Sequence, residues 1–188
     1  MALTDFNGAC VVITGASAGV GAACARAFAR EGAKLVLVAR GRDALEAIAV
    51  ELREQTEVLA VTGDVADPHV CDELVRQARE TFGAIDVLIN NAGLHHRGEV
   101  GGRTPAEIAA MVDVNLRAPL YLTTQCLPAM LQAGRGAVVM VGSLAGRAPL
   151  QGAATYGATK AGLRSFAWGL ADEVRDAGIS VGVVSPGP

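Results

Sequence analysis

Thr14-Gly15-Ala16-Ser17-Ala18-Gly19-Val20-Gly21 follows a short apolar run and leads into a segment with helical periodicity that begins at about Gly21. Glycines in such a turn allow the chain to bend tightly and a pyrophosphate to approach the start of the helix, where free N–H groups and the helix dipole favour negative charge. A turn needed only for packing a strand against a helix is the alternative. The strand-turn-helix context favours dinucleotide binding.

Apolar runs alternate with amphipathic segments along the rest of the chain. The predicted strands are Cys10 to Thr14, Lys34 to Ala39, Glu57 to Thr62, Asp86 to Ile89, Gly136 to Val141 and Ile179 to Val184, with helices near 21–31, 42–54, 67–82, 104–133 and 155–177. Continuous runs such as LVLVA and AVVMV are typical of strands covered on both faces. The pattern predicts an α/β fold of Rossmann type, one domain over residues 1–188 with a doubly wound parallel sheet in strand order 3-2-1-4-5-6.

Composition argues against several function classes. The 16 basic and 19 acidic residues are scattered, so nucleic acid is not an expected partner. Charged residues or glycines interrupt every apolar stretch, so no membrane partner is expected, and without a signal-like start the predicted location is cytoplasmic. No metal site is expected, because the four cysteines are far apart and the adjacent His95 and His96 diverge.

Several motifs in the chain resemble those of the classical short-chain dehydrogenase/reductase family. They are TGxxxGxG at 14–21, Asp64-Val65, Asn90-Asn91-Ala92-Gly93, Asp113-Val114-Asn115-Leu116, Tyr156 with Lys160, and Ser185-Pro186-Gly187. The resemblance covers essentially the whole chain and implies hydride transfer between a nicotinamide cofactor and a small-molecule carbonyl or alcohol substrate. Because Ser185-Pro186-Gly187 directly follows the last predicted strand, we expect the family's C-terminal segment to be missing.

The resemblance also assigns cofactor contacts. They fall on Gly15, Ser17, Ala18, Gly19, Val20, Gly21, Arg40, Asp64, Val65, Asn91, Ala92, Gly93, Tyr156, Lys160, Pro186 and Gly187. Asp64 would accept a hydrogen bond from the adenine amine, and a cap for the following segment is its alternative role.

Cofactor choice depends on Arg40, which stands where a carboxylate would bind the ribose hydroxyls of NAD. Its guanidinium can hold a 2′-phosphate, with Arg42 as support, so NADP(H) is favoured over NAD(H). Solvated surface arginines are the alternative. Ala18 stands where many NADP-using relatives carry a basic residue.

Proton transfer is predicted at Tyr156 and Lys160, one of only two tyrosines and one of only two lysines. Positions i and i+4 share a helix face, and a nearby cation favours ionisation of a phenol, whose ordinary pKa near 10 is high for acid–base work at neutral pH. An exposed lysine beside a packed tyrosine is the alternative. The resemblance implies that Ser143 polarises the carbonyl oxygen, Tyr156 exchanges the proton, and Lys160 assists the tyrosine and holds the nicotinamide ribose.

Asn115 completes the predicted catalytic set of Asn115, Ser143, Tyr156 and Lys160. Pro119 has no N–H, so the helical bond to the Asn115 carbonyl cannot form and a helix irregularity is expected. In the family, such an irregularity lets the main-chain oxygen hold a water of the proton relay. A bent packing helix with an incidental asparagine is the alternative.

Two other function classes fit the motifs less well. A non-catalytic dinucleotide-binding sensor or scaffold shares the fold, but it has no evident need for all four catalytic residues. An epimerase or dehydratase branch usually begins with GxxGxxG, which the turn at 14–21 lacks. From the family we expect a homodimer or homotetramer through the two long helices, with Phe166 and Trp168 as packing or interface residues. His95 is expected to be an ordinary loop residue or to rim the substrate cleft with Arg97, Arg147 and Gln151.

Overall fold

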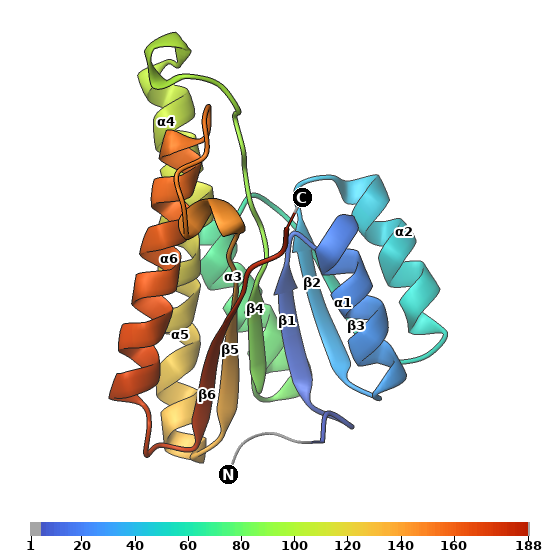
Figure 1. Cartoon of the computed structure of the whole chain (residues 1–188). Coiled ribbons are helices and arrows are strands. Elements are labelled where there is room, and N and C mark those ends of the chain that lie inside the picture. The colour runs from blue at the N-terminus through green and yellow to red at the C-terminus, as the bar shows by residue number, and fades with distance from the viewer. Residues whose placement is uncertain (1–4, 188) are drawn as a thin grey trace.

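Six strands form one parallel sheet in the computed structural model, which describes residues 5–187 (Figure 1). They are β1 (Cys10–Thr14), β2 (Lys34–Ala39), β3 (Val58–Thr62), β4 (Val87–Asn90), β5 (Gly136–Val141) and β6 (Ile179–Val184). The order across the sheet is β3-β2-β1-β4-β5-β6, and every neighbouring pair is parallel. The predicted fold class and strand order are therefore confirmed.

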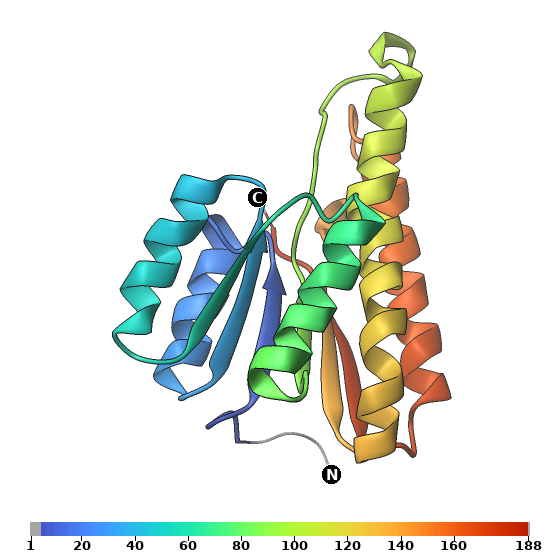
Figure 2. The same ribbon diagram turned by 180° about the vertical axis from the view of Figure 1, so that it is seen from behind.

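Helices cover the sheet in two layers. The helices are α1 (Gly19–Arg30), α2 (Arg42–Arg53), α3 (Pro68–Phe82), α4 (Pro105–Val112), α5 (Ala118–Ala133) and α6 (Ala154–Glu173), with a π-helical segment η2 (Asp113–Arg117) and short turns η1 (Val100–Gly102) and η3 (Leu144–Gly146). Figures 1 and 2 show α1 and α2 on one face of the sheet and α3, α5 and α6 on the other. None of the helices among residues 5–187 combines the length and the apolarity needed to cross a bilayer.

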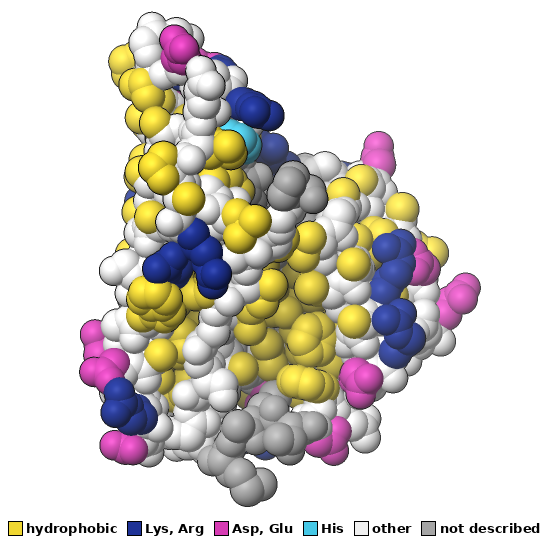
Figure 3. All heavy atoms as spheres, viewed as in Figure 1, with side chains coloured by type: hydrophobic (Ala, Val, Ile, Leu, Met, Phe, Trp, Pro, Cys, Tyr) yellow, Lys and Arg dark blue, Asp and Glu magenta, His cyan; other side chains and the backbone are white. Residues whose placement is uncertain are grey.

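The core follows the alternation of side chains along the strands. Val11 and Ile13 of β1 pack in the layer of α1 and α2, whereas Cys10 and Val12 pack in the layer of α3, α5 and α6. All five residues of β1 are buried, which explains a run without polar alternation. On the α1 side, described helices leave part of β5 and β6 uncovered, and apolar surface is visible there, with Val184 57% exposed (Figure 3).

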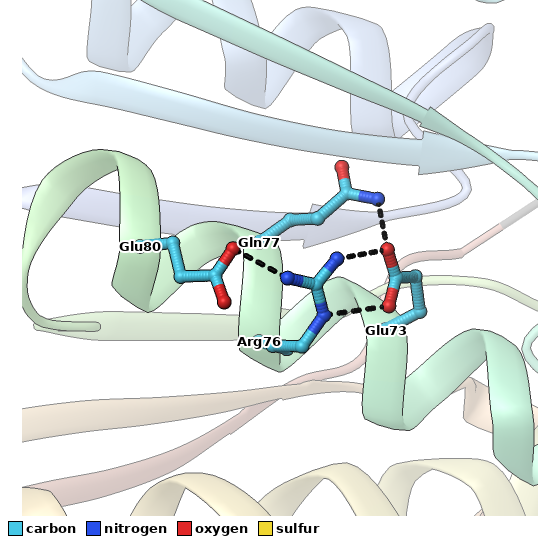
Figure 4. Close-up of polar contacts among 4 residues, drawn as sticks. All are labelled: Glu73, Arg76, Gln77 and Glu80. Carbon is cyan, nitrogen blue, oxygen red and sulfur yellow. Dashed lines mark hydrogen bonds and ion pairs between the residues drawn. The ribbon is translucent and has the colours of Figure 1, made fainter.

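The outer face of α3 carries a network of charged side chains (Figure 4). Arg76 pairs with both Glu73 and Glu80, and the Gln77 amide donates to Glu73 at 2.6 Å. Hydrogen bonds from Arg76 and then Gln77 lower the pKa of Glu73 to about 2. Because the charged side chains of Glu73, Arg76 and Glu80 are each 45% exposed or more, the network contributes little to stability.

Several boundaries differ from the prediction. The first helix begins at Gly19 instead of Gly21, because the Ala18 carbonyl already accepts a hydrogen bond from Ala22 N–H at 3.2 Å. The last helix ends at Glu173 instead of 177, where the Ala177 N–H bonds the Val174 carbonyl three residues back and the chain tightens into turns. The third strand begins one residue later than predicted, the fourth strand is shifted by one residue at both ends, and the segment 104–133 is interrupted by η2.

Candidate active site

Two adjoining clefts open at the carboxyl edge of the sheet, where the ends of parallel strands meet. The first cleft is lined by Gly15, Ser17, Val38, Ala39, Arg40, Gly41, Gly63, Asp64, Val65, Ala92, Gly93, Leu94 and Val114. The second is lined by Gly15, Asn91, Ala92, Gly93, His95, Val141, Gly142, Ser143, Tyr156, Lys160, Pro186 and Gly187. Gly15, Ala92 and Gly93 line both, so the two clefts form one continuous groove.

Five predicted site residues do not line these clefts. Ala18, Gly19 and Val20 are exposed in and just after the glycine turn, whereas Gly21 and Asn115 are buried. The strand-end residues Val38, Gly63, Val141 and others were missed by the sequence reasoning, although their position at the carboxyl ends of predicted strands is a signal that could have identified them.

The glycine turn leaves room only for backbone. A Cβ on Gly21 would lie 2.3 Å from the Gly15 carbonyl oxygen, and one on Gly15 would lie 2.9 Å from the Ala92 Cα. Gly19 has φ +54°, a left-handed conformation that favours glycine. No side chain caps the start of α1, and its first turn holds no acidic residue. The N–H groups there are therefore suited to an anionic group such as a pyrophosphate.

Asn91 joins the end of β4 to the end of β1. Its side-chain amide donates to the carbonyls of Thr14 at 2.8 Å and Gly15 at 3.1 Å. The Thr14 hydroxyl oxygen in turn accepts the backbone N–H groups of Asn91 at 3.0 Å and Ala92 at 2.9 Å. The side chains of Asn91 and Thr14 therefore tie these neighbouring strand ends together, and they hold the floor of both clefts.

Arg40 and Asp64 face each other across the first cleft. The Arg40 guanidinium lies 3.8 Å from one Asp64 carboxylate oxygen, and the other oxygen accepts the Ala66 N–H at 2.9 Å. Asp64 therefore stabilises the local turn, but the cap of α3 is Asp67, whose side chain accepts the His69 N–H. Both Arg40 and Asp64 keep polar atoms toward the cleft that a nucleotide could contact.

The second cleft brings together three of the predicted catalytic residues. Ser143 ends the segment after β5, and its hydroxyl oxygen accepts the Ala145 N–H at 3.2 Å, which leaves the hydroxyl hydrogen to donate elsewhere. Tyr156 lies in the first turn of α6 and is half-buried. Lys160, one turn later, has its ammonium 5.8 Å from the centre of the Tyr156 ring. The shared helix face predicted from the i, i+4 spacing is thus observed.

Lys160 is a buried cation. Its side chain is 3% exposed, and its ammonium donates to the Val141 carbonyl at 2.7 Å. Burial lowers the pKa of Lys160 to about 8, because the charged form loses hydration. The alternative of an exposed lysine is therefore wrong.

Asn115 lies in the π-helical segment η2, so the expected helix irregularity is confirmed. The Ala118 N–H bonds the Asp113 carbonyl five residues back, directly before Pro119. The Asn115 side chain is fully buried: its oxygen accepts the Leu94 N–H at 2.7 Å, and its amide donates to the Leu94 carbonyl at 2.8 Å. With its side chain so engaged, the main-chain carbonyl is the group of Asn115 that is suited to a role in the site.

His95 is the residue whose position the sequence did not predict. Its ring stacks on the Tyr156 ring, with the centres 4.1 Å apart and the planes 18° from parallel. The expectation that His95 could rim the cleft agrees with its place in the lining of the second cleft, whereas its direct contact with the predicted proton donor was not predicted.

Comparisons with known proteins identify the family. The sequence profile of the family described as short chain dehydrogenase matches residues 9–188. An uncharacterized oxidoreductase of Staphylococcus aureus is 35% identical over 185 residues, 98% of this chain and 80% of that protein. A ketoacyl reductase of Nostoc sp. is 36% identical over 98% of this chain and 65% of its own length.

Solved structures give the same result. A metagenomic short-chain oxidoreductase in complex with NADP superposes with a TM-score of 0.93 and 35% identity, covering 98% of this chain and 85% of that one. A short-chain dehydrogenase from Streptomyces avermitilis superposes with a TM-score of 0.90 and 34% identity over 96% of this chain. This chain spans only 65% of the Streptomyces protein.

Proposed function

The chain belongs to the short-chain dehydrogenase family, and from that premise we propose that it transfers hydride between NADP(H) and a carbonyl or alcohol substrate, with Tyr156 as the general acid and base. The observation that carries the proposal is the convergence of Ser143, Tyr156 and Lys160 on one cleft that continues into the glycine turn. We further propose that residues 1–188 act as one binding and catalytic unit.

Ser143, Tyr156 and Lys160 have different roles in this mechanism. When bound, the nicotinamide cofactor supplies or accepts the hydride. The Ser143 hydroxyl donates to the substrate carbonyl oxygen as negative charge develops there, and Tyr156 delivers the proton to the same oxygen. The Lys160 ammonium favours the phenolate that remains and binds the nicotinamide ribose. In alcohol oxidation the same steps run in reverse.

Asn115 acts on the far side of Lys160 in this proposal. Its main-chain oxygen, which cannot receive a hydrogen bond from Pro119, holds a water that returns a proton toward Lys160 and Tyr156. The buried pairing of the Asn115 side chain with Leu94 keeps that backbone segment in place.

NADP(H) is the favoured cofactor because Arg40 at the end of β2 offers a permanent positive charge at the first cleft and no carboxylate stands beside it on the strand. The relative whose structure contains NADP supports the same choice. On binding, we propose that Arg40 turns from Asp64 to the 2′-phosphate and that Asp64 accepts from the adenine amine.

The decisive test compares the two tyrosines. Tyr156→Phe removes only the hydroxyl, so reduction of carbonyls by NADPH is expected to fall at least a hundredfold while the dissociation constant for NADPH stays within about twofold. The matched control is Tyr121→Phe, whose hydroxyl donates to Asp72 on the outer surface, and it should keep near-wild-type rates. A panel that includes a ketoacyl thioester, a sugar, a steroid and small ketones provides the substrates.

The same assay separates the enzyme from a sensor or scaffold of the same fold. The enzymatic proposal would be contradicted if the wild-type protein bound NADPH but reduced no compound of the panel at a rate higher than that of Tyr156→Phe.

We also propose that the chain acts in the cytoplasm as a homodimer or homotetramer, with the exposed Trp168 of α6 at the interface.

A further inference from the structure

The loop that follows β4 places an imidazole on the proposed proton donor. Parallel stacking of His95 on Tyr156 at 4.1 Å is direct contact between the two rings. His95 also lines the second cleft together with Ser143 and Lys160. A side chain in this place can restrict rotation of the phenol, whose hydroxyl must stay aligned with the substrate oxygen.

The backbone on both sides of His95 is tied down. On one side, Leu94 is held through its N–H and its carbonyl by the buried Asn115 amide. On the other side, the Gly98 N–H donates to the Gly152 carbonyl at 2.8 Å, which joins this loop to the segment before α6. Figure 1 shows the loop rising from β4 toward α4 beside the start of α6. The stack is therefore built between two anchored points and is not a chance contact of a free loop.

Charges around His95 favour its neutral form. Desolvation against the neighbouring atoms lowers the pKa of His95, and the charges of Arg97, Arg103 and His96 lower it further. Arg103 is itself paired with Glu107. From α6, Tyr156 stacks on the His95 ring, and Lys160 lines the same cleft. Because burial in this position disfavours the charged imidazole, protonation of His95 opposes its buried position against Tyr156.

We propose that His95 is a positioning residue: its neutral imidazole holds the Tyr156 ring in the orientation needed for proton transfer, and its protonation releases the ring and lowers activity at acid pH. This inference rests on the function proposed above. The loop residue thereby acts through Tyr156 without touching the reacting atoms.

Three variants separate stacking from titration. His95→Ala removes both and should lower kcat three- to tenfold at pH 7.5, with the NADPH dissociation constant unchanged. His95→Phe keeps a stacking ring without a titratable group, so kcat should return to within about twofold of wild type. The pH profile of kcat for the wild type should fall on the acid side, with a midpoint below the ordinary pKa of histidine. This fall should disappear in His95→Phe. His96→Ala, which changes the adjacent residue outside the stack, is the matched control for kcat at pH 7.5.

Wild-type rates and an unchanged acid limb in both His95 variants would overturn the inference. The Tyr156→Phe result stands apart from these outcomes, because it tests the proposed function with His95 intact. Proton NMR adds a readout that needs no turnover: the His95 ring signals should lie upfield through the Tyr156 ring current and move downfield in Tyr156→Ala. Identical His95 signals in the two proteins would show that the rings are not stacked, and would equally overturn the inference.

Discussion

At the scale of single residues, the proposed active site contains a charge that the fold stabilises poorly. Lys160 donates a hydrogen bond to the Val141 carbonyl but loses nearly all contact with water. Such a cost is typical of functional groups, since a leucine or methionine of similar size would pack there without it.

Lys160→Met should therefore stabilise the cofactor-free protein at neutral pH while abolishing turnover. With the pKa of Lys160 lowered to about 8 from 10.5, burial of the ammonium costs about 3 kcal/mol below pH 8, and loss of the bond to Val141 offsets about 1 kcal/mol of the gain. Between pH 8 and 10.5 the unfolded chain binds the proton more tightly than the folded one, so wild-type stability rises relative to the variant. Urea unfolding at pH 7 and pH 10 measures the difference in unfolding free energy between Lys160→Met and the wild type. A difference that does not shrink at pH 10 would contradict this account.

The sequence predicted this part of the site well where the residues that meet are close together along the chain. The i, i+4 spacing of Tyr156 and Lys160 puts both on one helix face whatever the rest of the fold does. The stack of His95 on Tyr156 joins a loop and a helix that are 61 positions apart in number and depends on two backbone anchors. No periodicity in the sequence encodes such a contact, so it could not be predicted.

At the scale of elements, η2 interrupts what would otherwise be one long helix from α4 to α5. Pro119 removes the N–H that a regular helix would direct to the Asn115 carbonyl. Pro128 also lies inside α5, but it is exposed and far along the helix from the second cleft. The two prolines therefore form a natural pair for comparison.

Pro119→Ala restores the missing donor and lets a regular α-helical register compete with η2. We expect kcat to fall about tenfold, a part of the 10²–10⁴ that proton transfer contributes, because the Asn115 carbonyl is then drawn into the helix. Pro128→Ala restores a donor away from the site and should leave kcat unchanged. Steady-state kinetics measure kcat, and circular dichroism checks that both variants fold. Equal kcat values for both variants would contradict a role of η2 in the proton relay.

Element positions were predictable because each strand is a continuous apolar run and the sheet is buried on both faces. The ends of the elements were less predictable. The helix α1 starts two residues before the expected Gly21. This start depends on the left-handed φ of Gly19, a conformation that glycine can adopt but that the sequence does not require. The break within 104–133 was predicted at Asn115, since the absence of an N–H at Pro119 is written in the sequence, whereas its π-helical form was not.

At the scale of the whole molecule, cofactor binding should report on the fold as a unit. A ligand that binds only the folded state stabilises it by about 2.7 kcal/mol at a hundred times its dissociation constant. NADPH at that concentration should raise Tm by about 5 to 10 °C for a domain of this size.

Arg40→Ala should reduce this stabilisation by NADPH while leaving that by NADH unchanged. Loss of the charge-assisted bonds to the 2′-phosphate is expected to weaken NADPH binding about 30-fold. Arg53→Ala, at the other end of α2 and paired with Glu46, controls for the loss of an exposed arginine. Calorimetric scans with each nucleotide measure Tm. An equal loss of stabilisation by NADH would show that Arg40 does not recognise the 2′-phosphate.

The pairing of β1 with β4 has a consequence for how the chain matures. Val11 lies opposite Val87, so this central contact closes a loop of 76 residues before any of its hydrogen bonds can form. The groove needs both strand ends and also Pro186 and Gly187 beyond β6. Refolding should therefore regain helical signal well ahead of nucleotide affinity, and an early intermediate would have secondary structure but no working cleft.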